Sequence, residues 1–135
     1  MPVLLTIRQG YCNQSIMENC PFCLIAAHQL PANILYEDDQ AIAIADLHPL
    51  AKVHILVIPK THIASMNELL PEHSMLLSEL LLTARKIAFE QGIGDDGYRL
   101  VINTNANGGQ TIFHLHVHLL GGAPLGADLM TRGLR

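Results

Sequence analysis

Three histidines alternate with apolar residues towards the C-terminal end of the chain, at positions 114, 116 and 118. Successive side chains of a β-strand point to opposite faces, so a strand here places all three imidazoles on one face. The other face then carries Phe113, Leu115, Val117 and Leu119. We therefore expect a sheet with one face in the core and the other a titratable, nucleophilic surface. Imidazole can act there as a nucleophile, a base or a metal ligand at neutral pH.

A glycine-rich turn, Gly108-Gly109-Gln110-Thr111, precedes this stretch. Glycines let the backbone approach a ligand closely, and N–H groups in such a turn can hold an anion. A histidine nucleophile beside an anion cradle favours phosphoryl or nucleotidyl transfer. The alternatives are an ordinary loop of Asn and Gly, and a run of surface histidines on a half-buried strand.

The remaining pattern predicts an α+β fold with one antiparallel sheet. Segments rich in β-branched and other apolar residues predict strands at 34–36, 41–46, 53–58, 98–103 and 111–120. A short apolar patch at 22–28 predicts one or two helical turns. A long helix is expected to begin at Pro71, a favourable first helical residue, and to end at Gly92 and Gly94.

The long helix carries two apolar lines. A broad stripe is expected to pack on the sheet; it consists of Leu76, Leu80, Ala84, Ile87 and Ala88. The opposite face holds Met75, Leu82 and Phe89 at heptad spacing, which favours contact with another helix, and hence a homodimer. Scattered exposed apolar side chains are the alternative.

Length and composition exclude several classes of protein. The 135 residues are enough for one domain. The net charge is −4 and Trp is absent, which argues against a nucleic-acid-binding protein. The sequence contains no apolar run long enough to span a membrane and no signal-peptide pattern, so we expect no membrane partner and a cytoplasmic location.

The N-terminal region contains the three cysteines, Cys12, Cys20 and Cys23. An odd number argues against a disulfide scaffold. The Cys20-Pro21-Phe22-Cys23 pair indicates either a metal knuckle or reduced thiols. Residues 1–16 show no clear period, so we expect a poorly ordered extension there, followed by a single domain over 17–135.

The chain resembles the histidine-triad superfamily of nucleotide hydrolases and transferases. The signature is His-x-His-x-His with apolar x after Gly-Gly-Gln-Thr. The likeness covers about residues 18–135 and is greatest to the Hint branch, the purine nucleoside phosphoramidases, in bacterial form. It is supported by the stretches 34–39, 46–49, 54–60, 97–105 and 119–126. The resemblance implies a five-stranded antiparallel sheet with one long helix and a short N-terminal helix, and a sheet extended across a homodimer formed through the long helix.

The resemblance also implies a role for each matching residue. His116 is the expected nucleophile on the α-phosphorus of a purine nucleotide, forming a nucleotidyl-imidazole intermediate, and His118 is a phosphate contact and proton donor. Asn103 and Thr111, with the backbone of Gly109 and Gln110, hold the phosphate. Asp46 accepts the ribose hydroxyls, unless it only ends a strand. The base pocket is formed by Leu47, Ile44, Phe22 and Ile25, which are equally compatible with plain core.

The family needs no metal or organic cofactor for its chemistry, but some bacterial members hold a structural zinc ion. The matching residues here are Cys20, Cys23, His54 and His114. Reduced thiols, with both histidines hydrogen-bonded near the active site, are the alternative. Four further histidines are expected at the surface: His28, His48, His62 and His73.

The expected activity is hydrolysis of a purine nucleoside phosphoramidate to a nucleoside monophosphate and an amine. Two alternatives within the superfamily are a dinucleoside polyphosphate hydrolase and a nucleotidyltransferase. A third is a nucleotide-binding regulatory protein. The sequence leaves open the leaving group and the choice between adenine and guanine.

Overall fold

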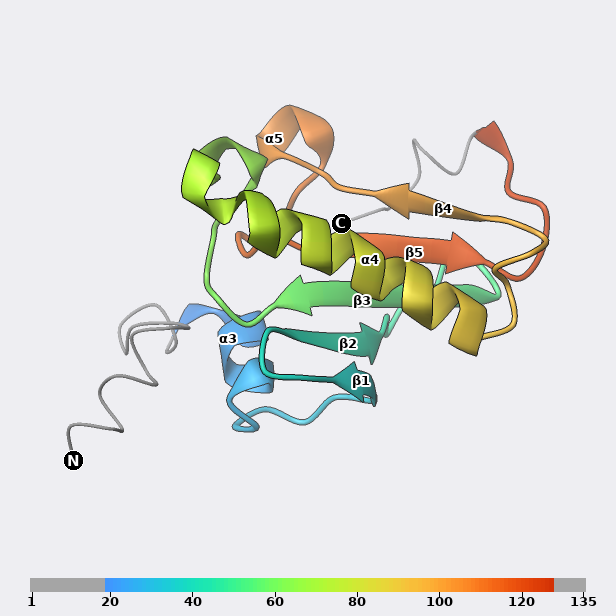
Figure 1. The fold of residues 1–135 in the computed structure, drawn as a ribbon, viewed down its shortest axis with the longest axis horizontal. Coiled ribbons are helices and arrows are strands. Elements are labelled where there is room, and N and C mark those ends of the chain that lie inside the picture. The colour runs from blue at the N-terminus through green and yellow to red at the C-terminus, as the bar shows by residue number, and fades with distance from the viewer. Residues whose placement is uncertain (1–18, 128–135) are drawn as a thin grey trace.

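The computed structural model describes residues 19–127. The extension expected at 1–16 lies outside the described residues. Five strands form one sheet: β1 (Ile34–Glu37), β2 (Ala41–Ala45), β3 (Val53–Pro59), β4 (Tyr98–Val101) and β5 (Val117–Gly121). The helices are α3 (Pro21–Ala26), α4 (Ser74–Glu90) and the short α5 (Asn105–Gly108), with 3-10 turns η1 (Met66–Glu68) and η2 (Pro71–His73). The predicted five-stranded α+β architecture is therefore confirmed (Figure 1).

All neighbouring strands of the sheet are antiparallel, in the order β1-β2-β3-β5-β4. The pairing of β3 with β5 opposes His54 to Leu120 and Leu56 to His118. β5 is shorter than predicted, because the chain before Val117 leaves the ladder. There the Leu115 N–H donates to the Ile63 carbonyl at 2.7 Å, beyond the end of β3, instead of extending the strand pair.

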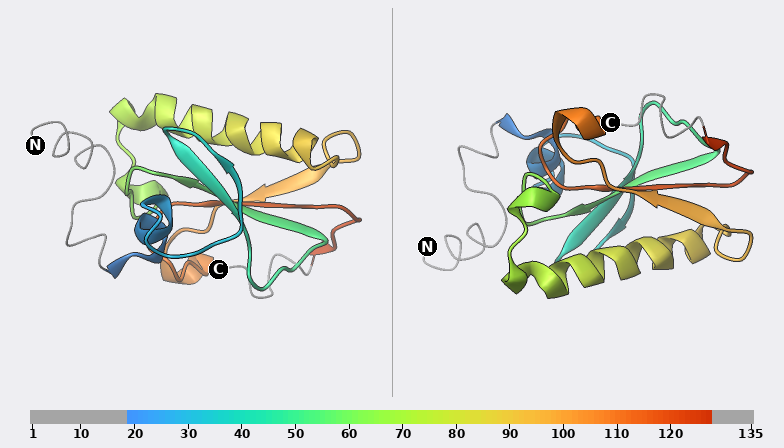
Figure 2. Two further views of the ribbon diagram at one scale, coloured as in Figure 1. Left: turned by 90° about the horizontal axis from the view of Figure 1, so that it is seen from below. Right: turned by 90° about the horizontal axis from the view of Figure 1, so that it is seen from above.

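Helix α4 covers one face of the sheet (Figure 2). Its predicted core stripe packs as expected: Leu80, Ala84, Ile87 and Ala88 are buried, and Leu76 packs against them. The sheet side chains in this core include Ala43, Ile55, Val57, Val117 and Leu119. Pro71 begins a 3-10 turn, and the α-helix proper starts at Ser74, three residues later than predicted.

The opposite face of the sheet lies under α3, with α5 on the same side (Figure 2). Here α3 contributes Phe22, Cys23 and Ile25 to a second core with Ile42, Ile44, Leu56 and Ile58. This arrangement covers the face that was expected to be a titratable, nucleophilic surface. His114, His116 and His118 are 0%, 4% and 1% exposed, because α3 and the loops beside it cover the histidine face. Phe113, which was expected to face the core, is 51% exposed.

In the part of the chain that the structure describes, no helix is both long and apolar enough to cross a membrane.

Candidate active site and metal centre

Five imidazoles and one phenyl ring form a continuous row under α3. Neighbouring ring centroids lie 4.8–5.9 Å apart. The order along the row is His54, His118, His116, Phe22, His114, His62. The edge-on Phe22 ring separates the row into two groups, and hydrogen bonds give each group its own chemistry.

The tautomer of His116 is set by its own backbone. Nδ1 of His116 donates to the carbonyl of His114 at 2.7 Å. The other neutral tautomer would set a nitrogen lone pair against this buried carbonyl, at a cost of about 1–3 kcal/mol. His116 therefore keeps its lone pair on Nε2, the atom that a nucleophilic imidazole uses.

A chain of hydrogen bonds sets the tautomer of His118. The Leu50 N–H donates to Nδ1 of His54 at 3.1 Å, so the proton of a neutral His54 ring lies on Nε2. That Nε2–H donates to Nδ1 of His118 at 2.9 Å. The proton of a neutral His118 ring therefore lies on its own Nε2, and His118 can donate a proton beside His116.

Asp46 adjoins this chain of hydrogen bonds. Its Oδ2 lies 3.4 Å from Nε2 of His54, while its Oδ1 accepts the His48 N–H at 2.8 Å. Burial lowers the pKa of His54, although the Asp46 charge opposes this. His54 is therefore neutral at pH 7, which the hydrogen-bond chain requires.

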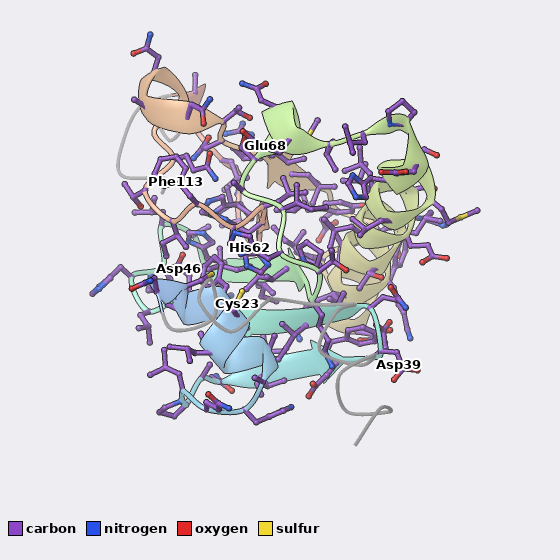
Figure 3. The ribbon with its side chains drawn as sticks, turned by 90° about the vertical axis from the view of Figure 1, so that its left-hand side faces the viewer. Cys23, Asp39, Asp46, His62, Glu68 and Phe113 are labelled. Atoms are coloured by element: carbon purple, nitrogen blue, oxygen red, sulfur yellow. The ribbon has the colours of Figure 1, made fainter. Side chains whose placement is uncertain are left out.

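The second group of side chains lies on the other side of Phe22. Cys20, Cys23, His62 and His114 each offer a ligand atom, and these four atoms lie within 4.8 Å of one another. Sγ of Cys23 is 3.3 Å from Nδ1 of His62, and Sγ of Cys20 is 3.3 Å from Nδ1 of His114. Figure 3 shows Cys23 on α3 beside His62, which follows β3.

The ligand set differs from the expected one, because His62 takes the place assigned to His54. The antiparallel direction of β3 and β5 explains the difference. In an antiparallel pair, the start of one strand lies beside the end of the other. His54, near the start of β3, is therefore opposite the end of β5, whereas His114, before β5, lies near the segment after β3 that carries His62. His62 is partly buried and is therefore not the surface residue that was expected; the antiparallel pairing predicted from the sequence was the signal that could have identified it.

The chemistry of the four side chains fits a metal ion. Nε2 of His114 donates to the Pro59 carbonyl at 2.7 Å, which turns the Nδ1 lone pair towards the two sulfurs. Burial lowers the pKa of His114 to about 4 and also lowers the pKa of His62, so both rings are in the neutral form that binds metals. Burial raises the pKa of the Cys20 thiol. Cys23 is disulfide-bonded in this structure, so metal binding needs its reduced form.

The glycine-rich turn is built differently from expectation. Gly109 ends α5 in the left-handed conformation, with φ +87°, which glycine adopts readily. The N–H groups of Gly109 and Gln110 donate to the carbonyls of Ala106 and Asn105, at 3.0 and 3.1 Å. These two amides are therefore engaged within the turn. Of the other residues expected to hold the phosphate, Thr111 is exposed and Asn103 follows β4.

The expected base-pocket residues separate into two groups. Ile44, Phe22 and Ile25 are buried together in the α3-side core. Leu47 is 86% exposed on the loop after Asp46. Two surface cavities of about 790 and 370 Å³ lie elsewhere, and none of the row histidines lines either of them.

The chain is similar to several known proteins. Residues 19–126 match the family model for the scavenger mRNA decapping enzyme C-terminal binding domain. The purine nucleoside phosphoramidase of Escherichia coli K12 is 44% identical over 87% of this chain and 98% of its own length.

Two solved structures are also similar. A HIT family hydrolase from Legionella pneumophila has a TM-score of 0.80 and 43% identity, over 82% of this chain and 99% of that one. A zinc-bound histidine-triad protein from Mycobacterium smegmatis has a TM-score of 0.68 and 33% identity, over 83% of this chain and 80% of that one. The chain belongs to the histidine-triad (HIT) family of hydrolases.

Proposed function

We propose that this chain hydrolyses purine nucleoside 5′-phosphoramidates to a nucleoside monophosphate and an amine. The observation that carries the proposal is the pair of adjacent imidazoles with opposite tautomers, a lone pair on Nε2 of His116 and a proton on Nε2 of His118. Their ring centroids are 5.0 Å apart. The similarity to a purine nucleoside phosphoramidase supports the choice of a P–N substrate.

The reaction has two steps. In the first, Nε2 of His116 attacks the α-phosphorus and the P–N bond breaks, while the Nε2–H of His118 donates a hydrogen bond to the leaving nitrogen, which departs as the amine after taking up a proton from solvent. In the second, water attacks the nucleotidyl-imidazole, the water proton returns to solvent, and His116 is released with the nucleoside monophosphate. Covalent catalysis of this kind divides one difficult displacement into two easier ones.

The surrounding residues position the reacting groups. His54 contacts His118 and not the substrate, so it is a positioning residue that fixes which nitrogen of His118 carries the proton. Phe22 packs edge-on against His116 at a centroid separation of 5.1 Å and holds that ring in place.

The substrate contacts follow the family pattern. Asp46 is proposed to accept the ribose hydroxyls, which would add to its contact with His54. Asn103 and Thr111 are proposed to hold the phosphate. Phe22, Ile25 and Ile44 are proposed to form the floor of the base pocket, with Leu47 moving over the base from its exposed loop. No cofactor takes part in the proposed reaction.

Replacing the nucleophile tests the reaction. His116→Ala should lower turnover of a fluorogenic adenosine 5′-phosphoramidate roughly a thousand-fold or more, because the covalent route is lost. Calorimetry should show that adenosine 5′-monophosphate still binds. His73→Ala, at η2 and remote from the imidazole row, is the matched control and should keep full activity. Substantial turnover by His116→Ala would contradict the assignment, and preference of the wild type for diadenosine tetraphosphate would favour the alternative hydrolase.

We also propose that Cys20, Cys23, His62 and His114 hold a structural zinc ion. Two thiolates and two imidazoles complete a tetrahedral site without an open position, so the metal would stabilise the fold and leave the reaction to His116. The zinc-bound relative from Mycobacterium smegmatis supports this choice of metal.

A pair of histidine variants tests the ligand set. Reduced wild-type protein should retain about one zinc ion per chain after dialysis, measured by plasma mass spectrometry. His62→Ala should lose it and His54→Ala should keep it, because only His62 lies in the cluster. Retention by His62→Ala with loss from His54→Ala would restore the ligand set expected from the sequence, and a zinc-free wild type would remove the site altogether.

We further propose that α4 and the edge strand β4 form a homodimer interface. Met75, Leu82 and Phe89 are 66%, 56% and 52% exposed along one line of α4. Gly94 packs against the Phe89 ring so closely that a Cβ there would lie 2.5 Å from a ring carbon. The motion of the Phe89 ring is thereby restricted before a partner binds, which lowers the entropic cost of association.

A charge at the C-terminal end of this line tests the interface. Phe89→Glu should convert the dimer to a monomer in light scattering, since a carboxylate would have to be desolvated at the interface. Phe113→Glu is the matched control, because Phe113 has a similar exposed fraction of 51% but lies outside α4 and β4. A wild-type monomer, or an unchanged dimer mass for Phe89→Glu, would contradict the proposed interface.

A further inference from the structure

The Gln110 side chain is buried, at 4% exposure, and it bonds to three separate segments of the chain. Its Oε1 accepts the Asn105 N–H at 2.9 Å, at the start of α5. Its Nε2 donates to the Ala64 carbonyl at 2.8 Å and to the Ile112 carbonyl at 3.0 Å. One carboxamide therefore uses its oxygen and both of its N–H donors in fixing loop geometry.

The three segments are those on which the proposed function depends. Ala64 lies two residues after His62, and Ile112 lies two residues before His114. Asn105 begins the turn that leads to Thr111. A second bond joins the segments that carry His62 and His114, because the Leu115 N–H donates to the Ile63 carbonyl at 2.7 Å. The Gln110 carboxamide thus joins the phosphate-side turn to the backbone of the two segments that carry His62 and His114.

The conformation of the turn makes such a tie necessary. Asn105 adopts φ +58°, a left-handed conformation that costs a residue with a Cβ some conformational energy. The turn is only four residues long, too short for a stable helix by itself. The Gln110 side chain holds the N–H of Asn105, while the Gln110 backbone N–H donates to the Asn105 carbonyl, so residues 105 and 110 are bonded in both directions.

We infer that Gln110 is a positioning residue that holds the phosphate-side turn in register with the His62 and His114 segments, and that its side chain does not contact the substrate. The inference rests on the proposed function, because it assigns the turn to the phosphate. Loss of the Gln110 side chain should weaken recognition of the phosphate and leave recognition of the nucleoside unchanged. Because Nε2 also fixes the segments of two proposed metal ligands, the same loss should weaken zinc binding.

Gln110→Glu is the sharpest variant, since a carboxylate has the same shape but cannot donate to the two carbonyls. Affinity for adenosine 5′-monophosphate, measured by calorimetry, should fall by roughly ten- to a hundred-fold, with adenosine affinity within about two-fold of wild type. Zinc affinity, measured by competition with a chromophoric chelator, should fall as well. Gln110→Met, which removes the donors without adding a charge, should give a smaller effect of the same kind.

The matched control is Gln91→Glu, the same chemical change at an exposed position after α4, and it should bind both ligands and zinc as wild type does. Circular dichroism identifies any variant that is unfolded, and Gln110→Met then replaces Gln110→Glu in the comparison. Equal losses of adenosine and adenosine 5′-monophosphate affinity in folded protein, or no loss of either, would overturn the inference. The assay contains no turnover step, so a wild type that binds the nucleotide without hydrolysing a phosphoramidate would contradict the proposed function alone.

Discussion

Antiparallel pairing of β3 with β5 brings together the chain segments that carry the five imidazoles of the row. Its register sets His118 opposite Leu56 and brings His54 within hydrogen-bonding distance of the His118 ring. The same direction of pairing returns the chain after β3 to the start of the histidine stretch, where His62 meets His114. One strand pair thus brings together two clusters of different composition, the adjacent imidazoles of His116 and His118 and the Cys/His cluster beside α3.

Backbone carbonyls and amides then decide what each ring can do. The His114 carbonyl sets the tautomer of His116, the Leu50 amide sets that of His54 and through it that of His118, and the Pro59 carbonyl sets that of His114. These bonds are buried, where a wrong tautomer would leave a carbonyl or an amide without its partner. Chemically identical side chains therefore have different hydrogen-bond environments, which depend on their positions on β3 and β5 and on the segments that adjoin these strands.

Periodicity predicted most of the fold and part of the site. A period of two residues predicts the strand segments and the shared face of the three triad histidines, and a period of 3.6 residues predicts the core stripe of α4. Both periods can be read from short stretches of sequence. The burial of that face depends on α3, and the start of β5 at Val117 depends on the Leu115 to Ile63 hydrogen bond. The conformation of the glycine turn depends on the bonds of Gln110. All of these are tertiary effects. The presence of His62 and not His54 in the Cys/His cluster depends on strand direction, which residue spacing alone does not show.

The central claim is that His116 forms a covalent bond to phosphorus, and direct detection of that bond tests it most directly. Wild-type protein mixed with an adenosine 5′-phosphoramidate, quenched within the first turnover and digested at neutral to basic pH, should yield a peptide that carries adenosine monophosphate. Fragmentation should place the added mass on His116, and the His116→Ala protein should give no adduct. An adduct on another residue, or hydrolysis without any adduct under conditions that preserve a phosphohistidine standard, would contradict the account.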